Sequence, residues 1–152
     1  PLKIVELPTP SELYATIIHP QIEIKTSEAR GILPYKIELS NAIKQWANVG
    51  SLISGLYTSN YELIADSLHD HIIEPYRSQL IPYFKEVHDV VLENGALGCG
   101  ISGSGPSIFS LCKGNTIAHK VADAMHDVYS KTGIKFDVYV SKINTEGVKI
   151  ID

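Results

Sequence analysis

The spacing of apolar residues along this 152-residue chain predicts several amphipathic helices. Apolar side chains recur at steps of three and four from Leu39 to Leu56, which is the period of one helix face. A second such helix is predicted over Tyr61–Leu68, and a helical region opens at Glu74-Pro75 and continues to Asn94-Gly95. A further helix covers Ile117–Val128, and Gly133 follows its end.

Other segments are rich in β-branched and aromatic residues, or alternate between apolar and polar positions, which predicts strands. The clearest are Leu13–Ile18, Ser107–Cys112 and Phe136–Val140. The opening run over residues 2–7 is also strand-like, and residues 148–151 fit a short strand.

The segment after the first strand predicts a short helix. Thr26 or Ser27 is the expected cap, and the helix runs to Leu33 with Pro34 beyond its end. The predicted order is therefore strand, several helices, strand, loop, strand, helix, strand. This order fits an α+β fold with a ferredoxin-like antiparallel sheet, helices on one face and extra inserted helices.

Length and charge restrict the class of protein. A chain of 152 residues is expected to form a single domain over residues 1–152. The net charge of −4, without a dense run of Lys or Arg, argues against nucleic-acid or anionic-membrane partners. No run approaches the ~20 apolar residues of a membrane span. We therefore expect a cytoplasmic protein with small-molecule or protein partners.

Cysteine and histidine placement gives no metal site. Cys99 and Cys112 lie in apolar runs and are expected to be buried, although a disulfide between their strands is geometrically conceivable. His69 and His71 lie two residues apart in a helical stretch, which would point them to different faces. The sequence therefore predicts no metal ligands.

A glycine-rich loop lies between two apolar, strand-like runs. It contains Gly98, Gly100, Gly103 and Gly105. The first three match a G-x-G-x-x-G pattern, but a strand rather than a helix follows, so a dinucleotide fingerprint is excluded. Successive backbone amides in such a turn bind a phosphate or carboxylate. The alternative is a hairpin turn that serves folding only.

The chain has only two arginines, Arg30 and Arg77. An arginine binds a carboxylate through two parallel hydrogen bonds, which a lysine does not do. Arg30 is expected in the first turn of its helix, where an anion would also interact with the helix dipole. Thr26, four residues earlier, would face the same side. The alternative is that Arg30 pairs with a surface acid and Thr26 is only a cap.

Three segments together resemble one known family. They are residues 19–34, Glu74-Pro75-Tyr76-Arg77 with Leu80-Ile81-Pro82, and Gly100–Ser107. The resemblance is to the homoserine kinase family of the GHMP kinase superfamily and spans nearly the whole chain. The glycine loop resembles the third motif of the superfamily in general, whereas the other two segments point to the homoserine branch.

This resemblance implies a reaction and a set of site residues. The reaction is ATP- and Mg²⁺-dependent transfer of the γ-phosphoryl group to L-homoserine, giving O-phospho-L-homoserine on the route to threonine. Thr26, Arg30 and Arg77 would contact the amino-acid substrate. A loop near substrate and phosphates would be formed by Gly100, Ser102, Gly103, Ser104 and Gly105.

The resemblance covers only the C-terminal half of the family. A nucleotide-binding loop of the P-x-x-x-G-L-G-S-S-A type is not found in these residues, and the chain opens on Pro1 rather than Met. We therefore expect ATP and Mg²⁺ to be bound mainly by an N-terminal domain absent from this chain, which alone would lack useful catalysis. The catalytic base is not identified.

Three other possibilities stay open. In the first, the parent protein is another kinase of the superfamily that acts on a different small alcohol. In the second, the chain is a stand-alone ferredoxin-like module that binds an amino acid or has a regulatory role, without catalysing a reaction. A homodimer is the third possibility, through a sheet edge or the helix Leu39–Leu56, and the sequence does not choose between these surfaces.

Overall fold

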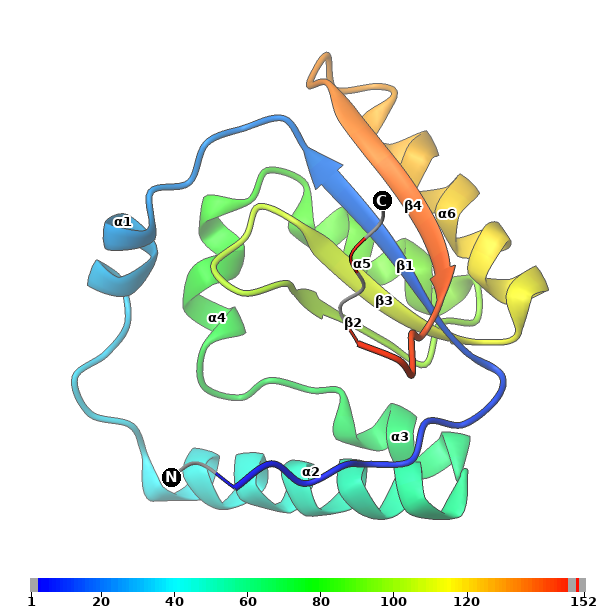
Figure 1. Ribbon diagram of the computed structural model, residues 1–152. Helices are drawn as coiled ribbons and strands as arrows, with labels where there is room; N and C mark the ends of the chain where they lie inside the picture. The colour runs from blue at the N-terminus through cyan, green and yellow to red at the C-terminus, as the bar shows by residue number, and fades with distance from the viewer. Residues whose placement is uncertain (1–2, 148–149, 151–152) are drawn as a thin grey trace.

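A computed structural model describes residues 3–147 and 150 (Figure 1). Its four strands are β1 (Leu13–Pro20), β2 (Gly98–Ile101), β3 (Ile108–Lys113) and β4 (Phe136–Lys142). They form one antiparallel sheet in the order β2-β3-β1-β4. The first strand in sequence is thus central, as in a ferredoxin-like sheet, and the predicted α+β class is confirmed.

The helices lie in two groups around this sheet. They are α1 (Thr26–Gly31), α2 (Leu39–Thr58), α3 (Tyr61–Ser67), α4 (Glu74–Arg77), a 3₁₀ turn (Ser78–Leu80), α5 (Phe84–Glu93) and α6 (Asn115–Tyr129). α5 and α6 cover one face, whereas α2 and α3 lie beyond β2 at the bottom of Figure 1. The inserted helices α2 and α3 therefore lie beside the β2 edge of the sheet and pack against each other (Figure 1).

The main core lies between the sheet and the helices α5 and α6. Strand residues on alternate positions face these helices, so Ile18 packs beside its cross-strand partners Ile108 and Val138. The fully buried members of this core are Ile18, Val87, Val91, Ile108, Cys112, Ala118, Val121, Met125 and Tyr129. Their burial supplies the main hydrophobic contribution to folding.

The predicted helical region from Glu74 to Asn94 is interrupted in the structure. The helical conformation is interrupted at Ile81-Pro82-Tyr83, between the 3₁₀ turn and α5. Pro82 has no amide hydrogen to donate, and Tyr83 has a φ of 62°, in the left-handed region. The apolar stripe of this region is therefore divided between two short helical pieces and α5.

The ends of the chain and of α1 differ from the sequence predictions. Residues 3–10 form no strand, and Ile4 is 92% exposed. The short strand predicted at residues 148–151 lies outside the described residues apart from Ile150. Lys25, rather than Thr26 or Ser27, precedes α1 as its cap position, and Arg30 lies in the last turn of α1, not the first. The helix-dipole argument for an anion at Arg30 was therefore wrong.

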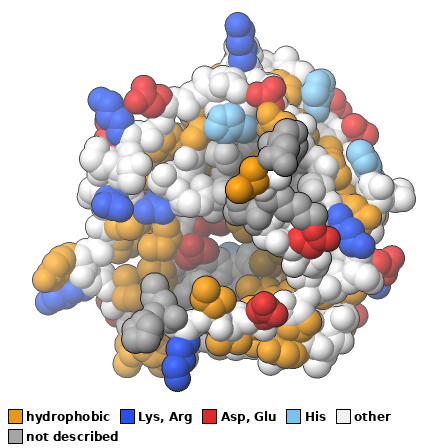
Figure 2. Space-filling model, in the orientation of Figure 1, with side chains coloured by type: hydrophobic (Ala, Val, Ile, Leu, Met, Phe, Trp, Pro, Cys, Tyr) orange, Lys and Arg blue, Asp and Glu red, His pale blue; other side chains and the backbone are white. Residues whose placement is uncertain are grey.

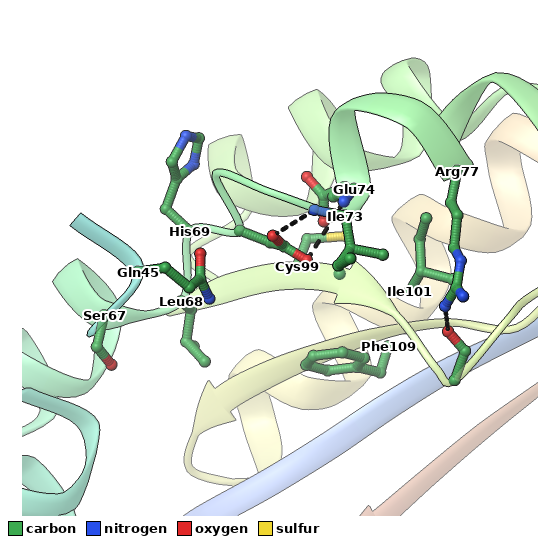
Figure 3. A pocket seen from close by; sticks show the side chains of 13 residues that line it. Gln45, Ser67, Leu68, His69, Ile73, Glu74, Arg77, Cys99, Ile101 and Phe109 are labelled. Carbon is green, nitrogen blue, oxygen red and sulfur yellow. Dashed lines mark hydrogen bonds between the residues drawn. The ribbon is translucent and has the colours of Figure 1, made fainter. Parts of the chain in front are cut away.

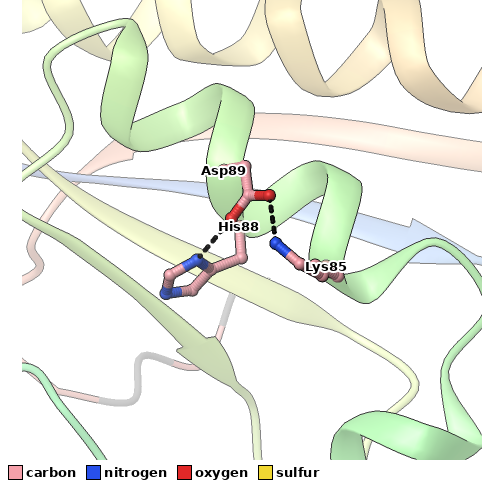
Figure 4. Close-up of polar contacts among 3 residues, drawn as sticks. All are labelled: Lys85, His88 and Asp89. Atoms are coloured by element: carbon pink, nitrogen blue, oxygen red, sulfur yellow. Dashed lines mark hydrogen bonds and ion pairs between the residues drawn. The ribbon is translucent and has the colours of Figure 1, made fainter.

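The outer face of α5 is a solvated surface (Figure 4). The Lys85 ammonium donates a hydrogen bond to the Asp89 carboxylate one turn later, and His88 Nδ1 lies 3.4 Å from the same carboxylate. The hydrogen bond from Lys85 lowers the pKa of Asp89 and in return raises the pKa of Lys85. Because both side chains are exposed, the pair contributes little to stability.

The apolar stripe that identifies α2 in the sequence lies on its outer surface. Leu39, Ile43, Trp46, Val49 and Ile53 of this stripe are exposed, with Trp46 66% exposed, whereas Leu56 is partly buried. Tyr57, one residue later, is exposed and extends the stripe. The residues of α2 that are buried against the rest of the molecule are small, Ala42 and Gly55. Figure 2 shows this side of the molecule hollowed between α2 and the sheet, with hydrophobic side chains along the lower edge.

Tyr129 connects the end of α6 to the helix break. Its hydroxyl donates to the carbonyl oxygen of Pro82 at 2.6 Å, and burial raises its pKa to about 12. We expect Tyr129→Phe to reduce the free energy of unfolding by about 0.5–1.5 kcal/mol, because this part-buried hydrogen bond is lost. Urea unfolding would measure this loss. Tyr139→Phe on the exposed side of β4 is the control, and an equal effect of both would refute the role of this hydrogen bond.

Candidate functional site

A cavity of about 370 Å³ lies between β2, the glycine loop, α4 and the inner side of α2 (Figure 3). Its walls combine one guanidinium and two carboxyl groups with apolar surface. The lining residues are Gln45, Ser67, Leu68, His69, Asp70, Ile73, Glu74, Arg77, Cys99, Gly100, Ile101, Gly103 and Phe109. A cavity of this size holds a small metabolite.

Asp70 organises the turn that leads into α4. Its carboxylate accepts hydrogen bonds from the amides of Ile72 at 2.7 Å, Ile73 at 2.8 Å and Glu74 at 3.2 Å. An acid in this position satisfies amides at the start of a helix that have no helical partner. The charge of Asp70 is thus used locally, and α4 is fixed at the rim of the cavity.

The same turn is attached to α2 by two amide side chains. The Gln45 carbonyl oxygen accepts from the amide of His71 at 2.9 Å, and Asn48 Nδ2 donates to the carbonyl oxygen of His69 at 2.7 Å. Both residues are partly buried, and these bonds direct them toward the turn rather than toward solvent. The position of α2 and the position of this cavity wall are therefore linked.

Arg77 joins three separate segments. Its Nε donates to the carbonyl oxygen of Ala29 in α1 at 3.1 Å, and its Nη1 donates to the carbonyl oxygen of Gly103 at 2.9 Å. Figure 3 shows the guanidinium extended from α4 toward the glycine loop. These bonds fix its orientation and leave other N–H groups of the guanidinium to bind a ligand.

Glu74 lies three residues before Arg77, on the same face of α4, and also lines the cavity. Within residues 3–147, its carboxyl group forms no hydrogen bond or ion pair. Burial, with a smaller contribution from the Asp70 charge, raises the pKa of Glu74 to about 7. A carboxyl group with such a pKa marks a candidate binding or catalytic site.

The glycine loop connects β2 to β3 and is closed by its own backbone. The amide of Ser102 donates to the carbonyl oxygen of Ser107 at 2.8 Å, and the amide of Gly105 donates to that of Ser102 at 3.0 Å. In the described part of the chain, the amides of Gly103 and Ser104 donate to no other group. Two successive free amides of this kind suit an anion.

Two glycines in this loop have a steric reason to be glycine. A Cβ on Gly100 would lie 3.0 Å from the ring of Phe109 and 3.5 Å from the Glu74 carboxyl. Gly105 has a φ of +85°, and a Cβ there would lie 3.0 Å from Ile81. Gly100 therefore keeps the cavity open beside Glu74, and Gly105 allows the turn.

The structure brings together only some of the residues singled out in the sequence. Arg77, Gly100 and Gly103 line the cavity. The remaining loop residues do not line it, namely Ser102, Ser104 and Gly105. Thr26 and Arg30 are exposed on α1, outside the lining residues, and α1 contacts the site through the Ala29–Arg77 bond. Across the described ranges, Arg30 has no hydrogen bond or ion pair, so the predicted alternative of a surface acid partner is not found.

The cysteines and histidines add no further chemistry here. Cys99 and Cys112 are buried free thiols, and burial raises the pKa of Cys99 to about 12, so it is not a nucleophile near neutral pH. His69 and His71 were predicted to lie in a helical stretch, but the structure places them in an irregular turn. The centroids of their two rings are 4.4 Å apart. No group of three potential metal ligands occurs among the residues that the structure describes.

Glu74, Asp70 and Gln45 were not identified as site residues from the sequence. Asp70 carries a signal, because an Asp side chain often accepts hydrogen bonds from backbone amides a few residues later in a turn. Glu74 carries a weaker one, because it precedes a proline of the kind that is tolerated in the first turn of a helix. Gln45 has no such signal, because its role depends on where α2 packs.

Within the described ranges, none of the helices combines the length and apolarity that a bilayer crossing demands.

The fold and the glycine loop agree with the protein-family comparison. Residues 52–131 match the family described as "GHMP kinases C terminal", which covers the end of α2 through α6 and every lining residue of the cavity except Gln45. The chain therefore belongs to the GHMP kinase C-terminal domain family.

Two individual relatives that match nearly the whole chain are homoserine kinases. The homoserine kinase of Chlorobium phaeobacteroides (strain BS1) is 46% identical over 99% of this chain and 48% of its own length. The crystal structure of homoserine kinase from Cytophaga hutchinsonii superimposes with a TM-score of 0.95 and 51% identity, over 98% of this chain and 47% of that one. The chain thus spans about half the length of these relatives.

A more distant structure shares the fold only. Streptococcus pneumoniae phosphomevalonate kinase, in complex with phosphomevalonate and AMPPNP, has a TM-score of 0.65 and 14% identity, covering 89% of this chain and 41% of its own.

The raised pKa of Glu74 gives a prediction for stability. Between its usual value near 4.5 and about 7, the folded protein retains a proton that the unfolded chain releases, so stability falls as the pH rises. We expect Glu74→Gln to stabilise the protein by about 1–3 kcal/mol at pH 8 and much less at pH 5. Thermal unfolding at both values measures this. A gain independent of pH would show that Glu74 carries no buried charge, and Glu93→Gln is the exposed control.

Proposed function

We propose that this chain is the substrate-binding C-terminal domain of an ATP-dependent homoserine kinase, which phosphorylates L-homoserine to O-phospho-L-homoserine in threonine biosynthesis. The observation that carries the proposal is the guanidinium of Arg77, fixed at the cavity by the carbonyl oxygens of Ala29 and Gly103. Homoserine kinases that match the chain over nearly its full length support the choice of substrate.

Arg77 and Arg30 bind the α-carboxylate of the substrate in this proposal. The N–H groups of Arg77 that are not used by backbone carbonyls are free for a carboxylate, as is the unpaired Arg30. Thr26 lies four residues before Arg30 in α1 and adds a hydroxyl to the same group. Binding the carboxylate end leaves the side-chain hydroxyl of the substrate directed toward the nucleotide.

The glycine loop, Gly100–Gly105, binds on the phosphate side. The free amides of Gly103 and Ser104 fit an anionic oxygen. Because these amides are hydrogen-bond donors, they suit the oxygens of a phosphate and not a metal cation. We assign ATP and Mg²⁺ mainly to an N-terminal domain, and phosphoryl transfer then depends on how the two domains position the reactants.

The exposed stripe on α2 supports the existence of a domain partner. Six large apolar side chains in one stripe are unusual on a free surface and are typical of an interface. We propose that an N-terminal domain packs against this side of the molecule. A homodimer and a cytoplasmic location stay predictions.

Substitution of the arginines in the full-length polypeptide tests the substrate site. We expect Arg30→Ala to raise the KM for L-homoserine about 10- to 150-fold, because one charge-assisted contact is lost. It should leave the melting temperature unchanged, since Arg30 has no partner in the described part of the chain. Arg77→Ala should raise KM similarly and also lower the melting temperature, because the Ala29 and Gly103 carbonyls lose their donor.

ADP release with Mg²⁺ and ATP provides the measurement, against L-homoserine and other small alcohols. Lys120→Ala, on α6, removes a positive charge on the opposite side of the sheet and serves as the control. An unchanged KM in both arginine variants would remove the assigned roles. Absence of turnover with any alcohol would favour a binding module without kinase activity.

A further inference from the structure

We propose that Glu74 binds the ammonium group of the amino-acid substrate, so that one short helix recognises a zwitterion through Glu74 and Arg77. The identity of the amino acid rests on the proposed function. Recognition of an ammonium group in this cavity rests on the arrangement of the two side chains.

Glu74 and Arg77 do not pair with each other. They lie at positions i and i+3 of α4 and line the same cavity, a spacing at which opposite charges commonly form an ion pair. No such pair forms within the described residues. Arg77 is instead turned toward Ala29 and Gly103, which separates the two charges along the cavity wall. An α-amino acid carries a cation and an anion on one carbon and fits between them.

The surroundings of the Glu74 carboxyl also favour a bound cation. It is partly buried, and no donor within the described ranges satisfies it. The titratable or charged groups that line the cavity with it are His69, Asp70, Arg77 and Cys99. Burial and the Asp70 charge raise its pKa to about 7, so the ionised form is unfavourable in the empty site. A bound cation would favour that form.

The Glu74 carboxyl is accessible from the cavity and suits an ammonium group. Gly100 lies next to Glu74, and a Cβ there would be 3.5 Å from Glu74 Oε2, so the lack of a side chain leaves the carboxyl accessible. Asp70 is occupied by three backbone amides. A primary ammonium carries one positive charge and N–H donors, which a single carboxyl group can neutralise and accept.

The test compares two ligands and two proteins, using the full-length polypeptide. L-homoserine carries the ammonium group, and 4-hydroxybutyrate lacks it but keeps the carboxylate and hydroxyl. We expect Glu74→Gln to weaken L-homoserine binding by about tenfold or more and to leave the binding of 4-hydroxybutyrate unchanged, as calorimetry would measure. Glu93→Gln, an exposed substitution on α5, should change neither.

A pH series gives a second measurement that needs no analogue. As the pH falls from 8 to 6, Glu74 becomes protonated, and the affinity of the wild-type protein for L-homoserine should fall. The affinity of the Glu74→Gln variant should be nearly constant over the same range. Equal pH profiles, or equal loss of affinity for both ligands, would overturn the proposal.

The outcomes also separate this inference from the proposed function. If the wild-type protein phosphorylates L-homoserine but Glu74→Gln shows no ammonium-dependent loss, only the inference fails. If it does not act on L-homoserine but binds another L-amino acid with a Glu74-dependent affinity, the substrate is wrong and the ammonium site stands. If it binds no amino acid, both fail.

Discussion

The candidate site depends on the two hydrogen bonds that the Arg77 guanidinium donates to backbone carbonyls. They attach α1 and the glycine loop to α4, three segments that are distant in sequence. Because these bonds use a fixed planar group, they orient the positive charge as well as holding the segments together. A lysine would keep the charge but not this geometry. The same residue is therefore structural and suited to bind a carboxylate.

The element types and the sheet topology followed from local patterns in the sequence. Alternation and β-branched residues identified β1, β3 and β4, and the three-to-four spacing identified α2. The patterns failed where the outcome depends on distant contacts. The stripe of α2 predicted a helix but not its orientation, since small residues face the molecule. The break at Pro82 was missed because the apolar stripe continues through it.

Site chemistry was harder to predict than the fold. The arginines stood out because they are rare in this chain, and the glycine loop because it is dense. Glu74 did not stand out, because its raised pKa comes from burial and from Asp70, both consequences of the turn over residues 68–73. Arg30 was placed at the wrong end of α1, since a helix boundary shifted by a few residues reverses a dipole argument.

The two faces of α2 have a consequence for communication between distant parts of the molecule. Gln45 and Asn48 hold the turn that carries His69 and Asp70, while Trp46 faces outward on the adjacent position of the same helix. A protein surface that packs against Trp46 would therefore contact the same helix whose opposite side supports the cavity wall. A tilt of α2 would carry Gln45 and Asn48 with it, and would thus change the shape of the pocket without any change in its lining residues.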